Sequence, residues 1–363
     1  MAIKHSAEYR DPEIAGKIVE RIKAVSRKPV RLMEVCGTHT MSIFKNGIRG
    51  LLPETIALIS GPGCPVCVTA QGEIDAFIAL AAMDDMIVTT FGDLLRVPGT
   101  GSSLQAERAR GRDIRIVYST VDALEIAAKN PNNNVVFLGV GFETTAPTVA
   151  AAILTADKMH LNNFSVLCAH KVLPPALVAL MEAGGAAIDG FILPGHVSVI
   201  IGTRAYRPFF EQYQVPCVIA GFEPADILEA ILVLVEQIET GTPQLVNGYR
   251  RAVTPDGNLK AKKMMQDIFE TADATWRGIG TIQKSGLKIK DDFAAFDALR
   301  RFDLTVPDTE NPKGCACGDI LTGQKTPIEC PLYKTACTPM HPVGPCMVSS
   351  EGTCAAYYRY HGA

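Results

Sequence analysis

Residues 134–147 read NVVFLGVGFETTAP, an apolar run that ends in a polar loop containing glycine. The same pattern recurs along the first two thirds of the chain, and helix-like stretches such as 224–238 (PADILEAILVLVEQI) separate the runs. Strands that alternate with helices predict βαβ units and a parallel sheet with helices on both faces. We therefore expect an α/β fold. The predicted strands are 30–35, 55–59, 86–91, 114–118, 134–140, 164–168, 188–193 and 215–220.

These strands form two sets that resemble each other. Matching strands lie about 100–110 residues apart, and a fixed offset indicates an internal repeat. The amino-acid sequence also repeats in part, because IVYSTVDALEIA (116–127) resembles VIAGFEPADILEAI (218–231). We expect two similar, duplicated α/β/α domains with parallel sheets and a third, cysteine-rich domain. The predicted boundaries are 25–125 and 126–225 for the α/β domains, and 1–24 with 226–363 for the third.

The region after the repeats has no pattern of alternating strands and helices. Residues 241–312 contain turns and helical pieces, such as NLKAKKMMQDIFETADATW, and no convincing strand series. Residues 313–363 are rich in cysteine and end in a helix-like, aromatic CAAYYRYHGA.

Composition excludes several classes of function. The 363 residues are 47% hydrophobic with a net charge of −3, so a large core is expected and neither nucleic acid nor an anionic membrane is indicated as a partner. No apolar run reaches the roughly 18 residues of a membrane span, and the charged, amphipathic start is unlike a signal peptide. We expect a cytoplasmic protein with reduced thiols, in which eleven cysteines indicate metal or redox chemistry.

Six of those cysteines crowd the last part of the chain. Thiolates select zinc or an iron–sulfur cluster, and the paired CxxC knuckles of a zinc ribbon are missing here. The irregular spacing of Cys317, Cys330, Cys337 and Cys354 favours a cubane cluster held by loops, with zinc or purely structural cysteines as alternatives. Cys315 and Cys346 are then left as a redox dithiol or as free buried thiols.

Three more cysteines follow the first two predicted strands. Cys36 ends one strand and opens CGTHT, where we expect an exposed thiol whose pKa is lowered by His39. Cys64 and Cys67 form a CxxC after the next strand, where helix amides would stabilise thiolates. Because consecutive strands are usually neighbours, all three thiols should meet, although an idle pair and a core cysteine are the ordinary alternatives.

Other polar residues also follow strands, where ligands bind in open α/β sheets. Thr38, Glu143, Thr144 and His196 are candidates for a cleft between the two domains, with solvated surface positions as the alternative. Cys168 and Cys217 lie inside apolar strands and are interpreted as core residues.

Taken in order, these motifs resemble the HypD family of [NiFe]-hydrogenase maturation factors, from about Val30 to Tyr357. The resemblance rests on CGTHT (36–40), GPGCPVC (61–67), GFETTAP (141–147), PGHVSVIIG (194–202) and the cysteine tail. It implies a scaffold on which an iron with two cyanides and one carbon monoxide is assembled. The implied partners are a small HypC-type chaperone and a HypE-type cyanide donor. It also implies two similar α/β domains and a third with a [4Fe–4S] cluster.

The resemblance assigns roles residue by residue. The family's cluster pattern falls on Cys317, Cys330, Cys337 and Cys354, although Cys315 also fits as the first ligand. Cys315 and Cys346 match an extra pair that resembles the dithiol of ferredoxin:thioredoxin reductase. The essential front thiols of the family fall on Cys36, Cys64 and Cys67.

The mechanism that follows is a hypothesis. Cys36 and a chaperone cysteine would hold a transient Fe(CN)2CO iron, with His39 tuning Cys36 or acting as a ligand. Cys64 and Cys67 would relay electrons that arrive through Cys315 and Cys346. The alternatives are a stand-alone iron–sulfur dithiol reductase and an interaction scaffold without redox function. No P-loop motif is present, so no familiar site for nucleotide hydrolysis is indicated.

Overall fold

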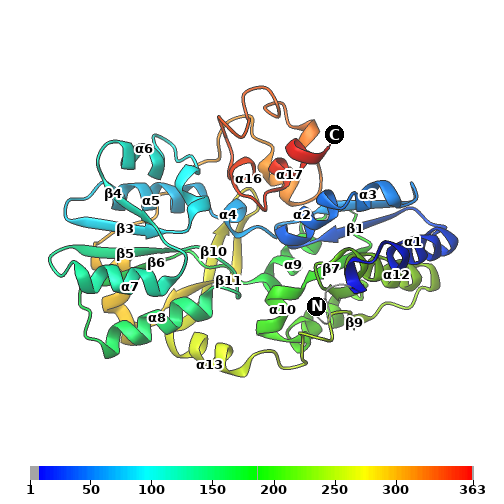
Figure 1. Ribbon diagram of the computed structural model, residues 1–363, viewed down its shortest axis with the longest axis horizontal. Helices are drawn as coiled ribbons and strands as arrows, with labels where there is room; N and C mark the ends of the chain where they lie inside the picture. The colour runs from blue at the N-terminus through cyan, green and yellow to red at the C-terminus, as the bar shows by residue number, and fades with distance from the viewer. Residues whose placement is uncertain (1–7, 186, 362–363) are drawn as a thin grey trace.

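Two parallel sheets form the body of the protein, as Figure 1 shows for the computed structural model, which describes residues 8–185 and 187–361. The order of one sheet is β2-β1-β7-β8-β9, and the order of the other is β4-β3-β5-β6. All pairings in both sheets are parallel. The strands are β1 (Val30–Glu34), β2 (Ile56–Ser60), β3 (Met86–Thr90), β4 (Asp113–Ile116), β5 (Asn134–Gly139), β6 (Phe164–Cys168), β7 (Gly190–Pro194), β8 (Cys217–Ala220) and β9 (Leu245–Asn247).

The predicted α/β class is confirmed, and every predicted strand exists close to its predicted position. The apolar runs are strands because helices cover the sheets and bury them, as in β3 and β7, where every residue is buried. The helices of the first half are α1 (Pro12–Val25), α2 (Gly37–Lys45), α3 (Ile48–Leu51), α4 (Pro65–Val68), α5 (Gln71–Ala81), α6 (Leu104–Ala109), α7 (Thr120–Lys129) and α8 (Ala146–Lys158). Those of the second half are α9 (Leu173–Glu182), α10 (Gly195–Ile201), α11 (Arg207–Tyr213), α12 (Pro224–Thr240), α13 (Leu259–Ile268), α14 (Ala298–Arg301), α15 (Cys317–Leu321), α16 (Pro345–Val348) and α17 (Thr353–Tyr360).

The predicted boundaries of the two α/β domains, 25–125 and 126–225, are wrong. β1 and β2 share a sheet with β7 and β8, while β3 to β6 form the other sheet between them in the sequence. In each sheet two strand pairs are joined through their first strands, β1 to β7 and β3 to β5, and β9 is a fifth strand of the first sheet. The two domains are therefore similar in strand order, but one is inserted into the other.

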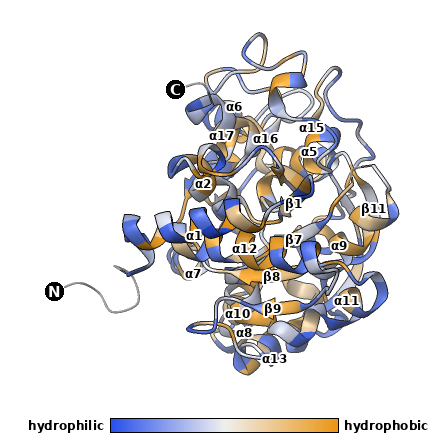
Figure 2. Ribbon diagram, turned by 90° about the vertical axis from the view of Figure 1, so that its right-hand side faces the viewer, coloured by the Kyte–Doolittle hydropathy of each residue, from blue (hydrophilic) through white to orange (hydrophobic). Residues whose placement is uncertain are grey.

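The predicted third domain is also too large. α1 packs on α12, and β9 extends the first sheet, so residues 12–25 and 224–247 belong to the domain that contains this sheet. Val19 and Ile22 of α1 are buried in this contact, and in Figure 2 α1 is largely hydrophilic at the edge of the molecule. The predicted residues 1–7 and 362–363 lie outside the described part of the chain. Within the described part, no helix has the length and apolarity needed to cross a membrane.

A β-hairpin occupies the region where only turns and helical pieces were predicted. After α13 the chain forms β10 (Phe269–Trp276) and β11 (Gly280–Ile289), which pair in antiparallel fashion. The helix-forming residues of 259–268 do form a helix, but Phe269 and Trp276 are buried as strand residues. The hairpin lies in the middle of the molecule, between the two sheets (Figure 1).

The cysteine-rich segment, 313–361, consists of short helices and loops that lie over the junction of the two sheets (Figure 1). Its last helix, α17, is helical as predicted and packs on α2, while α16 packs on α4. The turn of the hairpin supports it from below, because the backbone of Gly278 lies directly against that of Gly318.

Gly278→Ala should therefore destabilise the protein more than an alanine at a comparable glycine. Gly278 has φ +72°, and a Cβ there would lie 2.3 Å from the Cα of Gly318. Gly241 has φ +67° with no atom near the added Cβ. We expect a loss of about 1–2 kcal/mol for Gly241→Ala from backbone strain alone. For Gly278→Ala we expect about 2–4 kcal/mol, because strain and overpacking add.

Thermal and urea unfolding of both variants measure this difference. Equal losses would contradict the close packing of the hairpin turn on the cysteine-rich segment.

Candidate functional site

The loops that follow β1 and β2 meet at the carboxyl edge of the first sheet, as the sequence predicted for neighbouring strands. The two strands pair in parallel, and the N–H of Gly37 donates to the carbonyl of Gly63 at 3.0 Å. A Cβ at Gly63 would lie 2.1 Å from the backbone nitrogen of Cys36, so only glycine fits there. This close approach places Cys36 beside the start of the CxxC.

Cys64 and Cys67 form a disulfide, with their Cα atoms 5.2 Å apart. Cys64 caps α4, where its sulfur accepts a hydrogen bond from the N–H of Cys67 at 3.2 Å. Both side chains are buried, Cys64 at 4% and Cys67 at 0% exposure. The disulfide is therefore out of reach of a bulky partner from solvent.

Cys36 differs from the prediction of an exposed, acidic thiol. It is buried, because Gly37 and Thr38 pack against Glu351 of the cysteine-rich segment, and Thr38 Oγ1 donates to Glu351 Oε1 at 2.5 Å. Burial, and then the charge of Glu351, raise the pKa of Cys36 to about 11. The segment that covers the strand tips is thus the reason that the prediction was wrong.

His39 lowers that pKa only through its backbone N–H, which hydrogen-bonds the Cys36 sulfur, and not through a charged imidazole as predicted, because the ring is neutral. Burial lowers the pKa of His39 to about 4. Its Nε2 lies 2.8 Å from the carbonyl of Gly221, which can only accept, so Nε2 carries the proton. Nδ1 is then a bare lone pair, and it has no hydrogen-bond partner among the described residues. The rings of His39 and His196 both stack on Phe222, at 4.7 and 3.8 Å.

The loop of the second sheet contributes Glu143, which is buried with the half-buried Thr144 beside it. Glu143 Oε1 accepts from the N–H of Leu173 at 2.9 Å, and Oε2 has no partner in the described chain. Burial raises the pKa of Glu143 to about 7. Buried Tyr206 interacts electrostatically with both Glu143 and Cys36. Glu143 and Cys36, which follow strands of different sheets, thus both act on Tyr206, while the cleft between the two domains stays a prediction.

All six cysteines of the tail line one small pocket. They share it with apolar residues, and within it the Cys317 thiol contacts those of Cys315 and Cys346, while Cys346 also contacts Cys354. No three His, Cys, Asp or Glu side chains of the described residues are arranged so that they could hold a single metal ion. The lining comprises Cys315, Cys317, Ile320, Cys330, Leu332, Tyr333, Cys337, Gly344, Cys346, Met347 and Cys354.

We call this pocket the cysteine pocket. α16, which carries Cys346, packs on α4, which carries Cys67 of the disulfide. The hairpin turn completes the contact, because Trp276 bridges to Thr69. By contrast, Cys217 is a core residue as predicted, whereas Cys168 is only half-buried, with its thiol donating to the carbonyl of Leu287 at 3.2 Å.

The match to a family model of hydrogenase formation proteins, HypD, extends over residues 13–361. The chain belongs to the HypD family of hydrogenase maturation factors. The hydrogenase maturation factor HypD2 of Bradyrhizobium diazoefficiens is 49% identical over 99% of this chain and 97% of the relative. HypD of Cupriavidus necator is 47% identical over the same shares. A putative hydrogenase expression/formation protein of Methanocaldococcus jannaschii is 43% identical over 96% of this chain and 98% of its own length.

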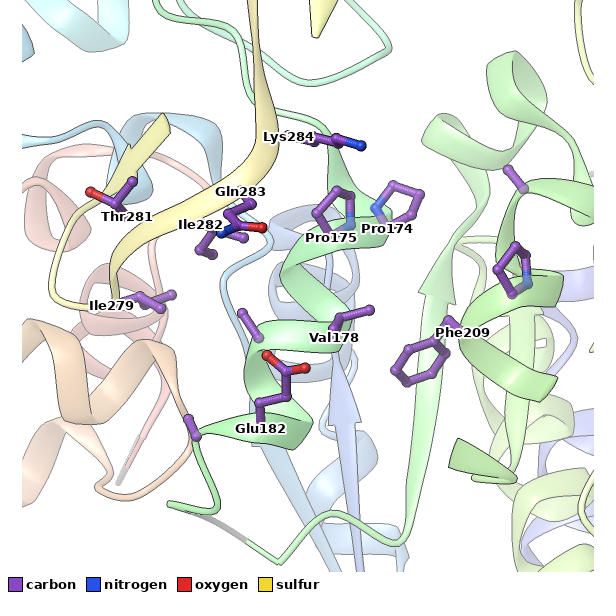
Figure 3. A pocket seen from close by; sticks show the side chains of 14 residues that line it. Pro174, Pro175, Val178, Glu182, Phe209, Ile279, Thr281, Ile282, Gln283 and Lys284 are labelled. Atoms are coloured by element: carbon purple, nitrogen blue, oxygen red, sulfur yellow. The ribbon is translucent and has the colours of Figure 1, made fainter. Parts of the chain in front are cut away.

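A pocket much larger than the cysteine pocket lies elsewhere in this HypD-family chain. It measures about 870 Å³ and is formed by α9, the region around α11 and the start of β11 (Figure 3). Pro174, Val178 and Phe209 give it an apolar wall, and Glu182 and Lys284 lie at its sides. No cysteine of the described residues lines it, so it is separate from the thiol chemistry.

Glu143 should make stability depend on pH. Its folded pKa of about 7 exceeds the ordinary value of 4.5, so the folded protein binds this proton more tightly than the unfolded chain. The stabilisation is complete below about pH 4.5 and is lost as pH rises to about 7, by roughly 3 kcal/mol. Glu143→Gln keeps the acceptor for Leu173 and should remove this loss.

Urea unfolding between pH 4.5 and 8 measures the effect, with the exposed Glu125→Gln as the control. An unchanged pH slope in Glu143→Gln would show that Glu143 is ionised in the fold.

Proposed function

We propose that this chain is the cytoplasmic scaffold on which an iron carrying two cyanides and one carbon monoxide is assembled for [NiFe]-hydrogenase. It would work in complex with a HypC-type chaperone and receive cyanide from a HypE-type donor. One observation carries the proposal: the buried disulfide Cys64–Cys67 is close both to Cys36, through Gly63, and to the helix that carries Cys346 of the cysteine pocket. A relay of thiols thus ends beside a thiol able to hold iron.

Cys36 is the proposed iron ligand on this chain, and the iron is the cargo. Soft thiolate ligands suit an iron(II) that is low-spin with cyanide and carbonyl. The raised pKa means that Cys36 loses its proton only as the metal binds. His39 offers a neutral imidazole with a bare Nδ1, which is the form of histidine that binds metals or accepts a proton. The second thiolate would come from the chaperone.

The cysteine pocket fits the [4Fe–4S] cluster that the family pattern implies. Its donors are thiols only, and its other walls are apolar, as iron–sulfur sites require. Cys317, Cys330, Cys337 and Cys354 would hold the cluster, which supplies single electrons when bound. Cys315 and Cys346 would remain as a dithiol, and Cys346 lies on the helix that faces the disulfide.

The disulfide Cys64–Cys67 would be the acceptor at the other end. Taking up two electrons and two protons, it becomes two thiols, and the electrons come one at a time from a one-electron donor. Its burial supports an internal role, because a protein disulfide substrate could not reach either sulfur. This argues against a stand-alone dithiol reductase acting on proteins. The reduced pair would supply electrons for attaching the diatomic ligands or for making carbon monoxide.

Cys36→Ser should abolish the bound iron unit. We expect the anaerobically purified protein, with its co-purifying chaperone, to show infrared bands of two cyanides and one carbonyl, and the variant to lack them. Cys217→Ala, a buried cysteine of β8 outside the site, is the control and should retain them. Bands that persist in Cys36→Ser would exclude Cys36 as the ligand.

Cys64→Ser and Cys346→Ser should each block hydrogenase maturation in cells. Both variants would interrupt the relay while leaving Cys36 in place, so the chaperone should still bind. Hydrogenase activity and co-purification of the chaperone measure the two effects separately. Normal maturation in both variants would favour the scaffold without redox function, whereas thiol turnover without a chaperone would favour the reductase.

A further inference from the structure

Arg277 is a buried cation at the turn between β10 and β11, with only 2% of its surface exposed. It is hydrogen-bonded to the segment that follows the disulfide. Its backbone N–H donates to the carbonyl of Val68 at 2.8 Å, its Nε to the carbonyl of Thr69 at 2.8 Å, and its Nη1 to Gln71 Oε1 at 2.6 Å. All three acceptors are neutral, so none of them balances its charge.

The carboxylate that interacts electrostatically with Arg277, that of Glu73, has other partners. It is the last of the groups that raise the pKa of Arg277. Its Oε1 accepts from Lys171 Nζ at 2.5 Å, and its Oε2 accepts from the N–H of Ala70 at 2.8 Å. A buried charge without a matched partner is strongly unfavourable unless a further group compensates it.

One donor of Arg277 is left over for such a group. Nη2 is buried and has no hydrogen-bond partner among the described residues. Besides Glu73, the groups that interact electrostatically with Arg277 are the thiols of Cys317, Cys346 and Cys315, all of which line the cysteine pocket. The adjacent Gly278 touches Gly318, which follows Cys317 directly. The guanidinium is therefore inserted between the disulfide segment and the cysteine pocket.

We propose that Arg277 is a positioning residue shared by the two thiol sites, with Nη2 donating to sulfur in the cysteine pocket while Nε and Nη1 hold the segment after Cys67. A fixed cation in a low-dielectric interior stabilises thiolate, so it raises the reduction potential of a nearby disulfide. Hydrogen bonds to cluster sulfurs also help to set a cluster's potential. Arg277 thus favours the reduced state at both ends of the relay. The part that concerns the cluster rests on the proposed function.

The disulfide can be tested without any cluster. The couple is Cys64–Cys67 plus two electrons and two protons giving two thiols, and dithiothreitol supplies both as it closes to its own cyclic disulfide. Metal-free protein is equilibrated with mixtures of reduced and oxidised dithiothreitol, and alkylation of the peptide with both cysteines is measured by mass spectrometry. For Arg277→Gln we expect a roughly tenfold shift of the equilibrium towards the disulfide, about 30 mV. Arg277→Lys keeps the charge and should shift less.

Arg301→Gln is the matched control. Arg301 is a half-buried arginine whose hydrogen bonds also go to neutral acceptors, the carbonyl of Asn162 and the side chain of Asn134, at the second sheet. It should titrate like the unmodified protein. Thermal unfolding of all variants establishes that each is folded, and Arg277→Lys preserves the test if Arg277→Gln is not. If the midpoint of Arg277→Gln equals that of Arg301→Gln, the proposal is overturned. If Arg277→Gln is unfolded, the same comparison is made with Arg277→Lys.

The cluster end is tested on protein reconstituted with iron and sulfide. A spectroscopic redox titration should show a potential about 59 mV lower in Arg277→Gln, which corresponds to tenfold for one electron. A shift of the disulfide without a shift of the cluster would overturn the shared role. If the unmodified protein takes up no cluster, the cluster part of the proposed function fails, while the dithiothreitol titration still decides the role of Arg277.

Discussion

β1 is hydrogen-bonded to β2 on one edge and to β7 on the other, so the first sheet cannot close until the chain has completed the second. This long-range pairing fixes where everything else lies. It makes the second sheet an insertion, and it brings the loops at the strand ends of both sheets to one junction. The hairpin and the cysteine-rich segment come last in the sequence and fill that junction (Figure 1). The cysteines of the strand ends and of the last segment lie close together because of this strand order.

The strands could be read from the sequence, but their partners could not. An apolar run between helices is a local signal, and burial on both faces of a sheet produces it directly. Which strand lies beside which depends on contacts between residues that are far apart in the sequence. The alternation of apolar runs and helices is the same whether one domain follows the other or is inserted into it. Each sheet takes one strand pair from each of the two predicted sets, so the predicted sets are not the two domains. The hairpin was missed because 259–268 forms a helix with no break before the buried Phe269.

The site was predicted in its residues and not in its environment. Cysteines at the ends of neighbouring strands can be recognised as a candidate site in the sequence, and Cys36, Cys64 and Cys67 do lie close together. Strand tips of open sheets usually face solvent, which is why exposure was expected; here Glu351 and its neighbours cover them. Arg277 carried no signal at all, because an arginine in a turn is ordinary until the turn is seen to be buried.

Burial of Cys36 has a consequence for how iron can be loaded. With a pKa of about 11, forming the thiolate at neutral pH costs about 5 kcal/mol before any metal binds. That cost applies to every metal equally, so it weakens binding by stray ions that would otherwise compete according to their affinity for sulfur. Iron that arrives with a second thiolate already attached can offset the cost, whereas a free ion in water cannot do so as readily. In the proposed function, the buried and protonated thiol of Cys36 therefore makes the binding of iron depend on a partner protein. The selectivity for iron then comes from the partner that delivers it, and not from the Cys36 thiol.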